Sequence, residues 1–424
     1  MPRTEKITVL VMSFTALACS TMSDVGVPDL RSIPAHWVER TDTYDPDWGD
    51  FTFYALSFST PTDGWIVGNR LLLHVTDGEL SVAFVRPAGV VLCTVDFLTP
   101  DDGWAGGWSS QLRQSGSQPP WDFGTSAGVV WRFRGGRWES VDLSPVSWPD
   151  WLVGGVHASP QGEVWADATI ELPGDDGHPP APPRLRPTQL RFDGVSWRVD
   201  ESLRADARRW MFYDICFDPS GPGWFVGADG ADRDRPRALA VGRRSDSWER
   251  AELPDLPGPN PRLSQVECFP GDHAIAAGNS EGLLSMDDGF PLLLRYDGVW
   301  HRIEPPDAFR HASVGAMAAV SDSDVWLALN RADRRAESRP AFLHWVDGEW
   351  SEVAPPALPE NRVDGYTFSD MQFVSPTEGW AIANDYGGPG IVRGLIFHYK
   401  DGVWRNRNWN WHFWDQHLFG LFGD

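Results

Sequence analysis

The stretch YDGVWHRIEPP, residues Tyr296–Pro306, predicts a β-hairpin, because an Asp-Gly pair follows an apolar run and a Trp-led strand then ends at two prolines. Asp-Gly favours the tight turn in which both central residues take positive φ angles. Proline cannot donate to a strand ladder, so it stops the second strand. Versions of this hairpin return along the chain, at GGRW (135–138), FDGVSW (192–197), VDGEW (346–350) and KDGVW (400–404).

The hairpin is one part of a longer repeat. Its Trp falls at spacings of 50 to 59 residues, at Trp138, Trp197, Trp248, Trp300, Trp350 and Trp404, with Leu80 as a degenerate first copy. A second motif, Phe-x-x-Pro-x-(Asp/Glu)-Gly-Trp, precedes this anchor. It ends at Trp65, Trp104 and Trp380, and weaker copies surround Trp165, Trp224, Ile275 and Trp326. The chain therefore holds seven units with one order of parts.

Each unit is predicted to form four strands. An apolar run such as Tyr54–Phe58 is strand a, and a Pro-x-x-Gly turn leads from it into strand b, which begins at the first Trp. Strand c, for example Leu292–Tyr296, is joined to strand d, Trp300–Ile303, by the Asp-Gly turn. Four-stranded units of this length are typical of propeller blades. We expect an all-β chain that folds as a seven-bladed β-propeller of antiparallel blades.

The tryptophans are predicted to pack between the blades. A blade is a small sheet with two apolar faces, and it can cover them only by stacking on its neighbours. Two Trp side chains per blade, on strands b and d, supply this contact. Either of two aromatic segments is expected to close the ring: His36-Trp37-Val38, which resembles a strand d without its own blade, or the C-terminal tail from Trp409 to Trp414.

The composition restricts the function. The chain has 24 Trp and 22 Phe residues, too many aromatics for a disordered protein, and a formal net charge of -23. Only Lys6 and Lys400 are lysines. A chain this acidic would be repelled by the phosphates of nucleic acid, which is therefore excluded as a partner. No motif for a nucleotide, a metal or another cofactor is present, and we expect none to bind.

The N-terminus predicts export. Arg3 and Lys6 precede an apolar run, Ile7–Leu17, which is too short to span a membrane and suits a signal peptide, residues 1–18. Small residues before Cys19 favour cleavage at that point and lipidation of Cys19, although Ala16-Leu17-Ala18 also fits ordinary cleavage. Residues 19–35 would then tether the domain, residues 36–424, to the outer membrane or the cell surface. We expect the protein to contact the membrane only through this lipid.

The turn and hairpin motifs carry a resemblance to known families. Gly-Trp-(Ala/Ile)-(Val/Ile) followed by Asp-Gly-x-Trp resembles the bacterial propellers of the Asp-box, sialidase-like group, although most copies lack the full Asp-box spacing. It is also similar to photosystem assembly-factor propellers and to Trp-rich repeat lipoproteins of bacteria. The resemblance covers residues 50–407. It implies the architecture, and for sialidase-like relatives a glycan-directed chemistry.

The innermost strands bring a row of side chains to the ring axis. The residue before the strand-a aromatic, or before its replacement, is Ser57, Asp96, His157, Cys216, Cys268 or Gln372. Asp96 beside His157 in the next blade is the pair with acid–base potential, and a satisfied structural pair is the favoured interpretation. Equivalent side chains of adjacent blades should point the same way round the ring. The sequence therefore predicts no Cys216–Cys268 disulfide, and the odd cysteine count rules out a disulfide framework.

The connections between strands b and c and between strands d and a vary most in length, and they lie on one face. They include the segments 107–128, 169–187, 228–236, 278–291 and 331–340. Such loops carry binding in repeat proteins. Acidic side chains gather in two of them, at Asp175, Asp176 and His178 and at Asp229, Asp232 and Asp234, with too few oxygens for a calcium loop.

Two functions remain open at this point. The favoured one is a monomeric binding or assembly module in the cell envelope, whose partner is an envelope protein or a glycan. The alternative is a hydrolase or lyase that acts on glycans. No catalytic residue is assigned for either.

Overall fold

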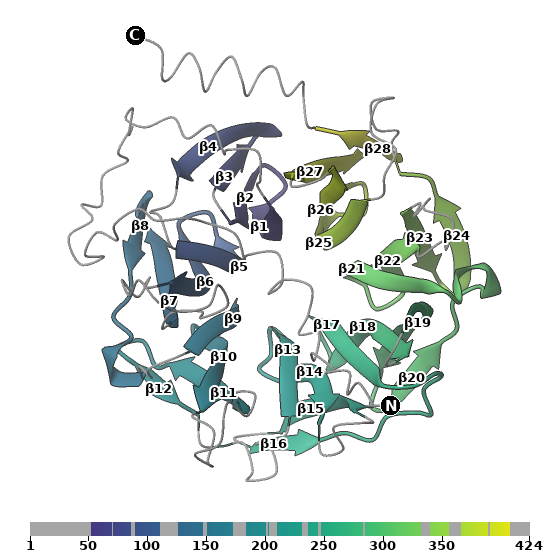
Figure 1. The fold of residues 1–424 in the computed structure, drawn as a ribbon, viewed down its shortest axis with the longest axis horizontal. Helices are drawn as coiled ribbons and strands as arrows, with labels where there is room; N and C mark the ends of the chain where they lie inside the picture. The colour runs from purple at the N-terminus through teal and green to yellow at the C-terminus, as the bar shows by residue number, and fades with distance from the viewer. Residues whose placement is uncertain are drawn as a thin grey trace, which may run out of the picture.

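The computed structural model describes residues 52–69, 71–85, 90–110, 126–146, 151–172, 184–200, 202, 210–230, 236–244, 247–282, 285–331, 340–355, 366–388 and 391–407. These residues form seven four-stranded antiparallel sheets, arranged in a ring (Figure 1). The predicted seven-bladed β-propeller is confirmed. Helix is confined, in the described part of the chain, to the 3-10 turns η3 (Ser144–Val146) and η5 (Asp307–Phe309). None of the helices described there is long and apolar enough to cross a membrane.

Every blade is built from four strands that follow one another in the sequence. Blades 1 to 4 hold β1 (Phe53–Thr60), β2 (Asp63–Gly68), β3 (Leu71–Thr76) and β4 (Glu79–Val85); β5 (Val90–Thr99), β6 (Asp102–Ser110), β7 (Ser126–Arg134) and β8 (Arg137–Ser140); β9 (Trp151–Ala158), β10 (Val164–Leu172), β11 (Arg184–Phe192) and β12 (Trp197–Val199); and β13 (Trp210–Phe217), β14 (Gly223–Asp229), β15 (Arg237–Arg244) and β16 (Ser247–Arg250). Blades 5 to 7 hold β17 (Pro261–Phe269), β18 (His273–Gly282), β19 (Ser285–Tyr296) and β20 (Trp300–Ile303); β21 (Ala312–Ser321), β22 (Asp324–Arg331), β23 (Ala341–Val346) and β24 (Glu349–Val353); and β25 (Tyr366–Ser375), β26 (Glu378–Gly388), β27 (Ile391–Lys400) and β28 (Val403–Asn406).

A pair of Trp side chains joins successive blades. The strand-b Trp of one blade meets the strand-d Trp of the next edge to face, with ring centroids 5.0–6.1 Å apart. The pairs are Trp65–Trp138, Trp104–Trp197, Trp165–Trp248, Trp224–Trp300 and Trp326–Trp404. Two junctions have one Trp each, because Ile275 and Leu80 replace the other. The predicted packing role is confirmed, with the difference that Trp138 and Trp350 are only partly buried.

The strand-b Trp is also covered from within its own blade. In blade 6 the His344 ring stacks on Trp326 at 3.9 Å and its Nε2 lies 2.6 Å from Asp324 Oδ1. His74 on Trp65 and His398 on Trp380 repeat this arrangement. In blade 2, Arg132 takes the place of the histidine, 4.8 Å above Trp104 and bonded to Asp102. In these four blades an imidazole or a guanidinium group thus covers one face of the indole.

The hairpin turns follow the sequence motif. Asp77, Asp347 and Asp401 all take positive φ, and so does the glycine after each of them, as the tight turn requires. In the Asp297-Gly298-Val299 turn, which has one residue more, the positive φ is confined to Gly298.

The ring closes between blades 7 and 1 through side chains. Asn384 accepts the N–H of Phe53 at 2.9 Å and donates to its carbonyl at 2.8 Å, while Arg407 donates to the Gly78 carbonyl at 2.6 Å. Blade 7 takes its fourth strand, β28, from its own sequence. The two expected closing segments, around Trp37 and Trp409, lie outside the described residues.

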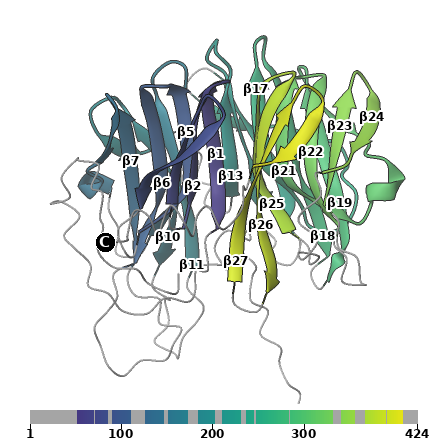
Figure 2. The same ribbon diagram turned by 90° about the horizontal axis from the view of Figure 1, so that it is seen from above.

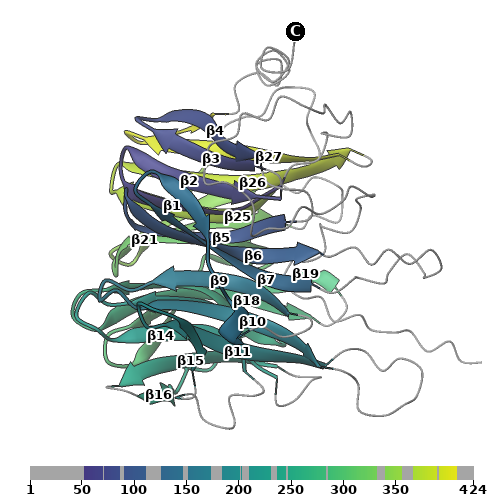
Figure 3. The same cartoon turned by 90° about the vertical axis from the view of Figure 1, so that its left-hand side faces the viewer.

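The two faces of the ring differ in how strands are connected. The a–b and c–d turns are short on every blade, for example 61–62 and 347–348, as expected. The segment 278–291, expected to be a loop, is mostly strand instead: β18 and β19 continue as one long hairpin. β26 and β27 form a second, and Figures 2 and 3 show both hairpins reaching beyond the other strands on the same side of the ring.

Truncating a fully buried strand-b Trp should destabilise the propeller. We expect Trp380→Ala to lower the free energy of unfolding by about 3–5 kcal/mol, since it opens a cavity between blades 7 and 1. Trp350→Ala, at a half-buried position, should cost clearly less. Denaturant unfolding of both variants tests this, and equal losses would show that burial at the blade junctions is not the main contribution.

Candidate functional site at the ring axis

The innermost strand of each blade has one edge without a strand partner, and at six of the seven junctions described side chains of the preceding blade bond to it. Asp370 Oδ2 accepts the N–H of Leu56 at 2.9 Å, and Asp214 Oδ2 accepts that of Val266 at 2.7 Å. A buried backbone N–H without an acceptor would destabilise the fold. The polar residues of strand a are therefore needed structurally, before any function is considered.

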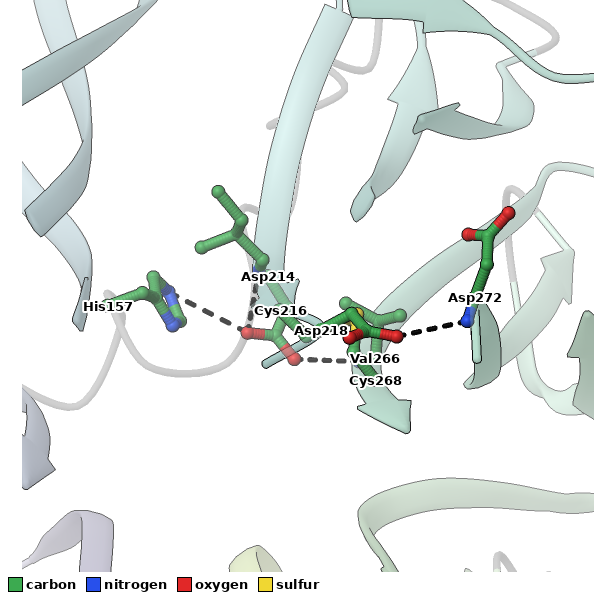
Figure 4. The surroundings of a disulfide bond; sticks show 8 residues. His157, Asp214, Cys216, Asp218, Val266, Cys268 and Asp272 are labelled. Carbon is green, nitrogen blue, oxygen red and sulfur yellow. Dashed lines mark hydrogen bonds and ion pairs between the residues drawn. A yellow bond between two sulfur atoms is a disulfide. The ribbon is translucent and has the colours of Figure 1, made fainter. Parts of the chain in front are cut away.

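A second row of the same contacts lies nearer the a–b turns. Each acceptor again receives the N–H of the next blade's inner strand, at 2.6–3.0 Å. The pairs are Ser57 with Phe97, Asp96 with Ala158, Glu267 with Ala319 and Gln372 with Phe58. Because Asp96 is bonded to Ala158, the expected Asp96–His157 pair is not the one that forms. His157 Nε2 instead lies 3.6 Å from Asp214 Oδ1, in the next blade (Figure 4).

A residue that the sequence analysis did not single out completes this group. Asp167 belongs to β10, the second strand of blade 3, and pairs with Gly155 of β9. A Cβ atom at Gly155 would lie 2.1 Å from Asp167 Oδ1 and 2.8 Å from His157 Nε2, and one at Gly154 would lie 2.6 Å from Asp167 Oδ2. The Gly-Gly pair thus leaves a window in the inner strand that the Asp167 carboxylate fills. The sequence did carry a signal for this residue, namely an Asp within the apolar run that starts at Trp165. The strand that pairs with this run holds two consecutive glycines.

Burial shifts the charges of this group strongly. Desolvation raises the pKa of Asp96 to about 6, of Asp167 and Asp370 to about 7, and of Glu267 to about 8. It raises the pKa of Asp214 well above its usual value, and repulsion from Asp370 and Asp167 adds to the shift. It also lowers the pKa of His157 to about 3.

Water nevertheless reaches the axis. The side chains of His157 and Asp214 keep 20% and 22% of their surface exposed, and Gly154 is exposed although it lies in an innermost strand. The desolvation of the carboxyls is therefore partial. Both shifts in the His157–Asp214 pair favour neutral side chains, so the 3.6 Å contact is not a strong salt bridge.

Cys216 and Cys268 form a disulfide, which corrects the expectation that they stay apart. Their Cα atoms lie 5.5 Å from one another, on the adjacent inner strands β13 and β17. The prediction failed because the innermost strands converge at the axis, where equivalent positions come within bonding reach. Cys93 does not take part, and its Sγ lies 3.3 Å from the Val153 carbonyl oxygen.

Most of the other candidate residues lie outside the described part of the chain. These are Cys19, Asp175, Asp176, His178, Asp232 and Asp234. Asp229 is described, and its Oδ2 pairs with Arg250 Nη1 at 2.5 Å, which is a structural contact within blade 4. Among the described residues, no group of three or more His, Cys, Asp or Glu side chains is placed to hold a metal ion.

Comparison with known proteins finds similarity at the level of whole structures. No protein-family model matches the chain, and no curated protein does. YCF48 bound to a D1 peptide is 16% identical, with a TM-score of 0.48 over 83% of this chain and 93% of that one. YCF48 from Cyanidioschyzon merolae is 14% identical, with a TM-score of 0.48 over 83% and 97%. An ulvan lyase, a polysaccharide lyase, is 9% identical, with a TM-score of 0.47 over 82% and 86%. Similarities this low carry no argument about function.

The axial carboxyls should make stability fall as pH rises. Asp370 has a pKa of about 7 in the folded protein and about 3.8 in the unfolded chain, so its contribution is complete below pH 4 and is lost by about pH 7. Asp370→Asn removes the charge and keeps an acceptor for Leu56. We expect the melting temperature of the variant, relative to wild type, to rise between pH 5 and pH 8.

Exposed Asp101→Asn is the matched control and should give a flat difference. His157, whose pKa is lowered, acts in the opposite direction, because its contribution is lost below pH 6.5. Its effect is common to wild type and variant and cancels in the difference. A flat difference for Asp370→Asn would show that its carboxyl is fully solvated.

Removing the disulfide should loosen the ring between blades 4 and 5. The bond closes a loop with a sequence separation of 52 residues, for which chain entropy predicts a stabilisation of about 2–4 kcal/mol. We expect Cys216→Ser to lose this amount in denaturant unfolding and to become insensitive to dithiothreitol. Cys93→Ser, the control, should unfold like wild type and keep its sensitivity to the reductant.

Proposed function

We propose that the chain is an exported β-propeller lipoprotein of the cell envelope. It is cleaved before Cys19, anchored through a lipid on that residue, and acts as a monomeric binding or assembly module. The working surface is the face that carries the b–c and d–a connections, and the partner is an envelope protein or a glycan. This is the role expected of the Trp-rich repeat lipoproteins that its motifs resemble.

The asymmetry between the two faces is the observation that supports binding. Short turns of two to five residues join strands on one face, whereas the connections of the other face include 111–125, 173–183 and 332–340. The long hairpins β18–β19 and β26–β27 extend on this second side. A rigid ring that presents variable segments on one face is how repeat scaffolds carry binding sites.

The disulfide supports export. Structural disulfides persist in oxidising compartments and are rare in the cytosol, where thiols are kept reduced. The Cys216–Cys268 bond therefore fits a chain that folds after translocation. This support comes from the axis of the ring and is independent of the N-terminal sequence.

Export and anchoring are tested by the mass of the protein extracted from membranes. We expect the mass of residues 19–424 plus acyl chains, and we expect Cys19→Ala to release the protein from the membrane fraction. A bare mature mass would reject the lipid and retain export. An uncleaved chain in the cytosol would overturn both.

Partner capture is tested with one variant on each face, a deletion and a point substitution. Replacing residues 173–183 by a short Gly-Ser link should abolish capture from envelope extract and leave the melting temperature nearly unchanged, because the link joins the same strand ends. Val195→Ser, at an exposed c–d turn of the same blade, is the control and should capture normally. Undiminished capture by the deletion variant would place the binding surface elsewhere. Turnover of a polysaccharide panel by the purified protein would favour the glycan-active alternative.

A further inference from the structure

In the part of the chain that the structure describes, the inner strands carry more acidic than basic side chains. The seven innermost strands carry Asp96, Asp214, Glu267 and Asp370, and Asp167 joins them through the glycine window. The basic side chains of the same seven strands are His157 and Arg262. Arg262 lies near the opposite end of its strand, in register with Asn279, in the row beyond the two rows of acids.

Several polar atoms beside the window have no partner. Gln189 is opposite Asp167 in the register of β10 and β11, so both side chains leave the sheet on the same face. Gln189 is 2% exposed, and its Oε1 and Nε2 both lack a hydrogen bond. His157 Nε2, on the same strand as the window, also lacks a hydrogen bond, as does Gln265 Oε1 on the inner strand of blade 5. Buried amides are normally satisfied, so these atoms indicate a partner that the described residues do not supply.

The spacing of the acids indicates which kind of cation fits. A calcium ion needs six to eight oxygens at 2.3–2.6 Å, and no group of the described His, Cys, Asp and Glu residues is close enough to share one. An alkylammonium group instead donates three hydrogen bonds at about 2.7–3.2 Å and brings an apolar chain with it. A linear chain with several such charges can match carboxyls spread along an axis.

We propose that the ring axis binds an alkylammonium group, with Asp167 and Asp214 as its hydrogen-bond acceptors. Asp370 of blade 7 acts on Asp214 electrostatically and adds negative charge when its carboxyl is ionised. The ligand is a free polyamine or the lysine side chain of a peptide, which share this chemistry. Water already reaches this position, since Asp214 is partly exposed and Gly154 is exposed. The site is separate from the proposed partner-binding face, and neither proposal depends on the other.

Calorimetric titration of the full mature protein with spermidine and with a short lysine peptide tests the proposal. At physiological ionic strength, which screens the surface charge of the chain, we expect one saturable site. Asp167→Asn and Asp214→Asn should each weaken binding at least ~10-fold, since hydrogen bonds to charged groups are strong. Each Asn keeps the shape of the side chain, and at position 214 it keeps an acceptor for Val266. Asp101→Asn, at an exposed turn, should bind as wild type does.

A second variant changes the space and leaves every charge in place. Gly155→Ala puts a methyl group where the Asp167 carboxylate lies, so it should weaken binding while the protein keeps its near-ultraviolet circular dichroism. Preference for spermidine or for the peptide identifies the source of the ammonium group. Absence of a saturable site, equal weakening by Asp101→Asn, or tighter binding of calcium than of either amine would each overturn the proposal.

Discussion

The edge-to-face contact between a strand-b Trp and the strand-d Trp of the next blade is the interaction on which the ring depends. Burying an indole removes roughly 150–250 Å² from water, and aromatic pairs add directional preference to that gain. Trp65 is enclosed by His74 from its own blade and by Phe97 and Trp138 from the next. Since no blade can cover its own faces, each junction stabilises both sheets that form it.

The same contact explains why the fold could be predicted from sequence. A Trp at the start of strand b and another after the Asp-Gly turn must recur in every unit, because the ring repeats one junction. Where another residue replaces one Trp of the pair, as Leu80 and Ile275 do, the partner Trp remains and the repeat can still be recognised. Strand number, order and turn positions follow from these anchors. The length of the β18–β19 hairpin could not be predicted from these anchors, because the Trp contacts between blades do not determine how far the hairpin extends.

The axis was harder to predict, for a geometric reason. Periodicity assigned the row that contains Asp96, His157 and Cys216, but it did not show which neighbours these side chains meet. Convergence of the inner strands brings Cys216 to Cys268 and His157 toward Asp214. Asp167 was missed because it belongs to strand b. In the other six blades, the side chains of this strand face the neighbouring blades. Its access to the axis depends on the absence of side chains at Gly154 and Gly155.

The polar lining of the axis has two roles that can be separated. Accepting a backbone N–H requires only an oxygen, and Ser57, Thr94 and Gln372 do this without a charge. Asp370 and Asp214 each accept two backbone N–H groups, one from the next blade and one from the following residue, so both carboxyl oxygens have a structural use. Asp167 accepts no hydrogen bond from a neighbouring inner strand in the described structure, and burial of its carboxyl raises its pKa to about 7. A charge that is costly to bury and unnecessary for closing the ring is most simply explained by a cationic ligand.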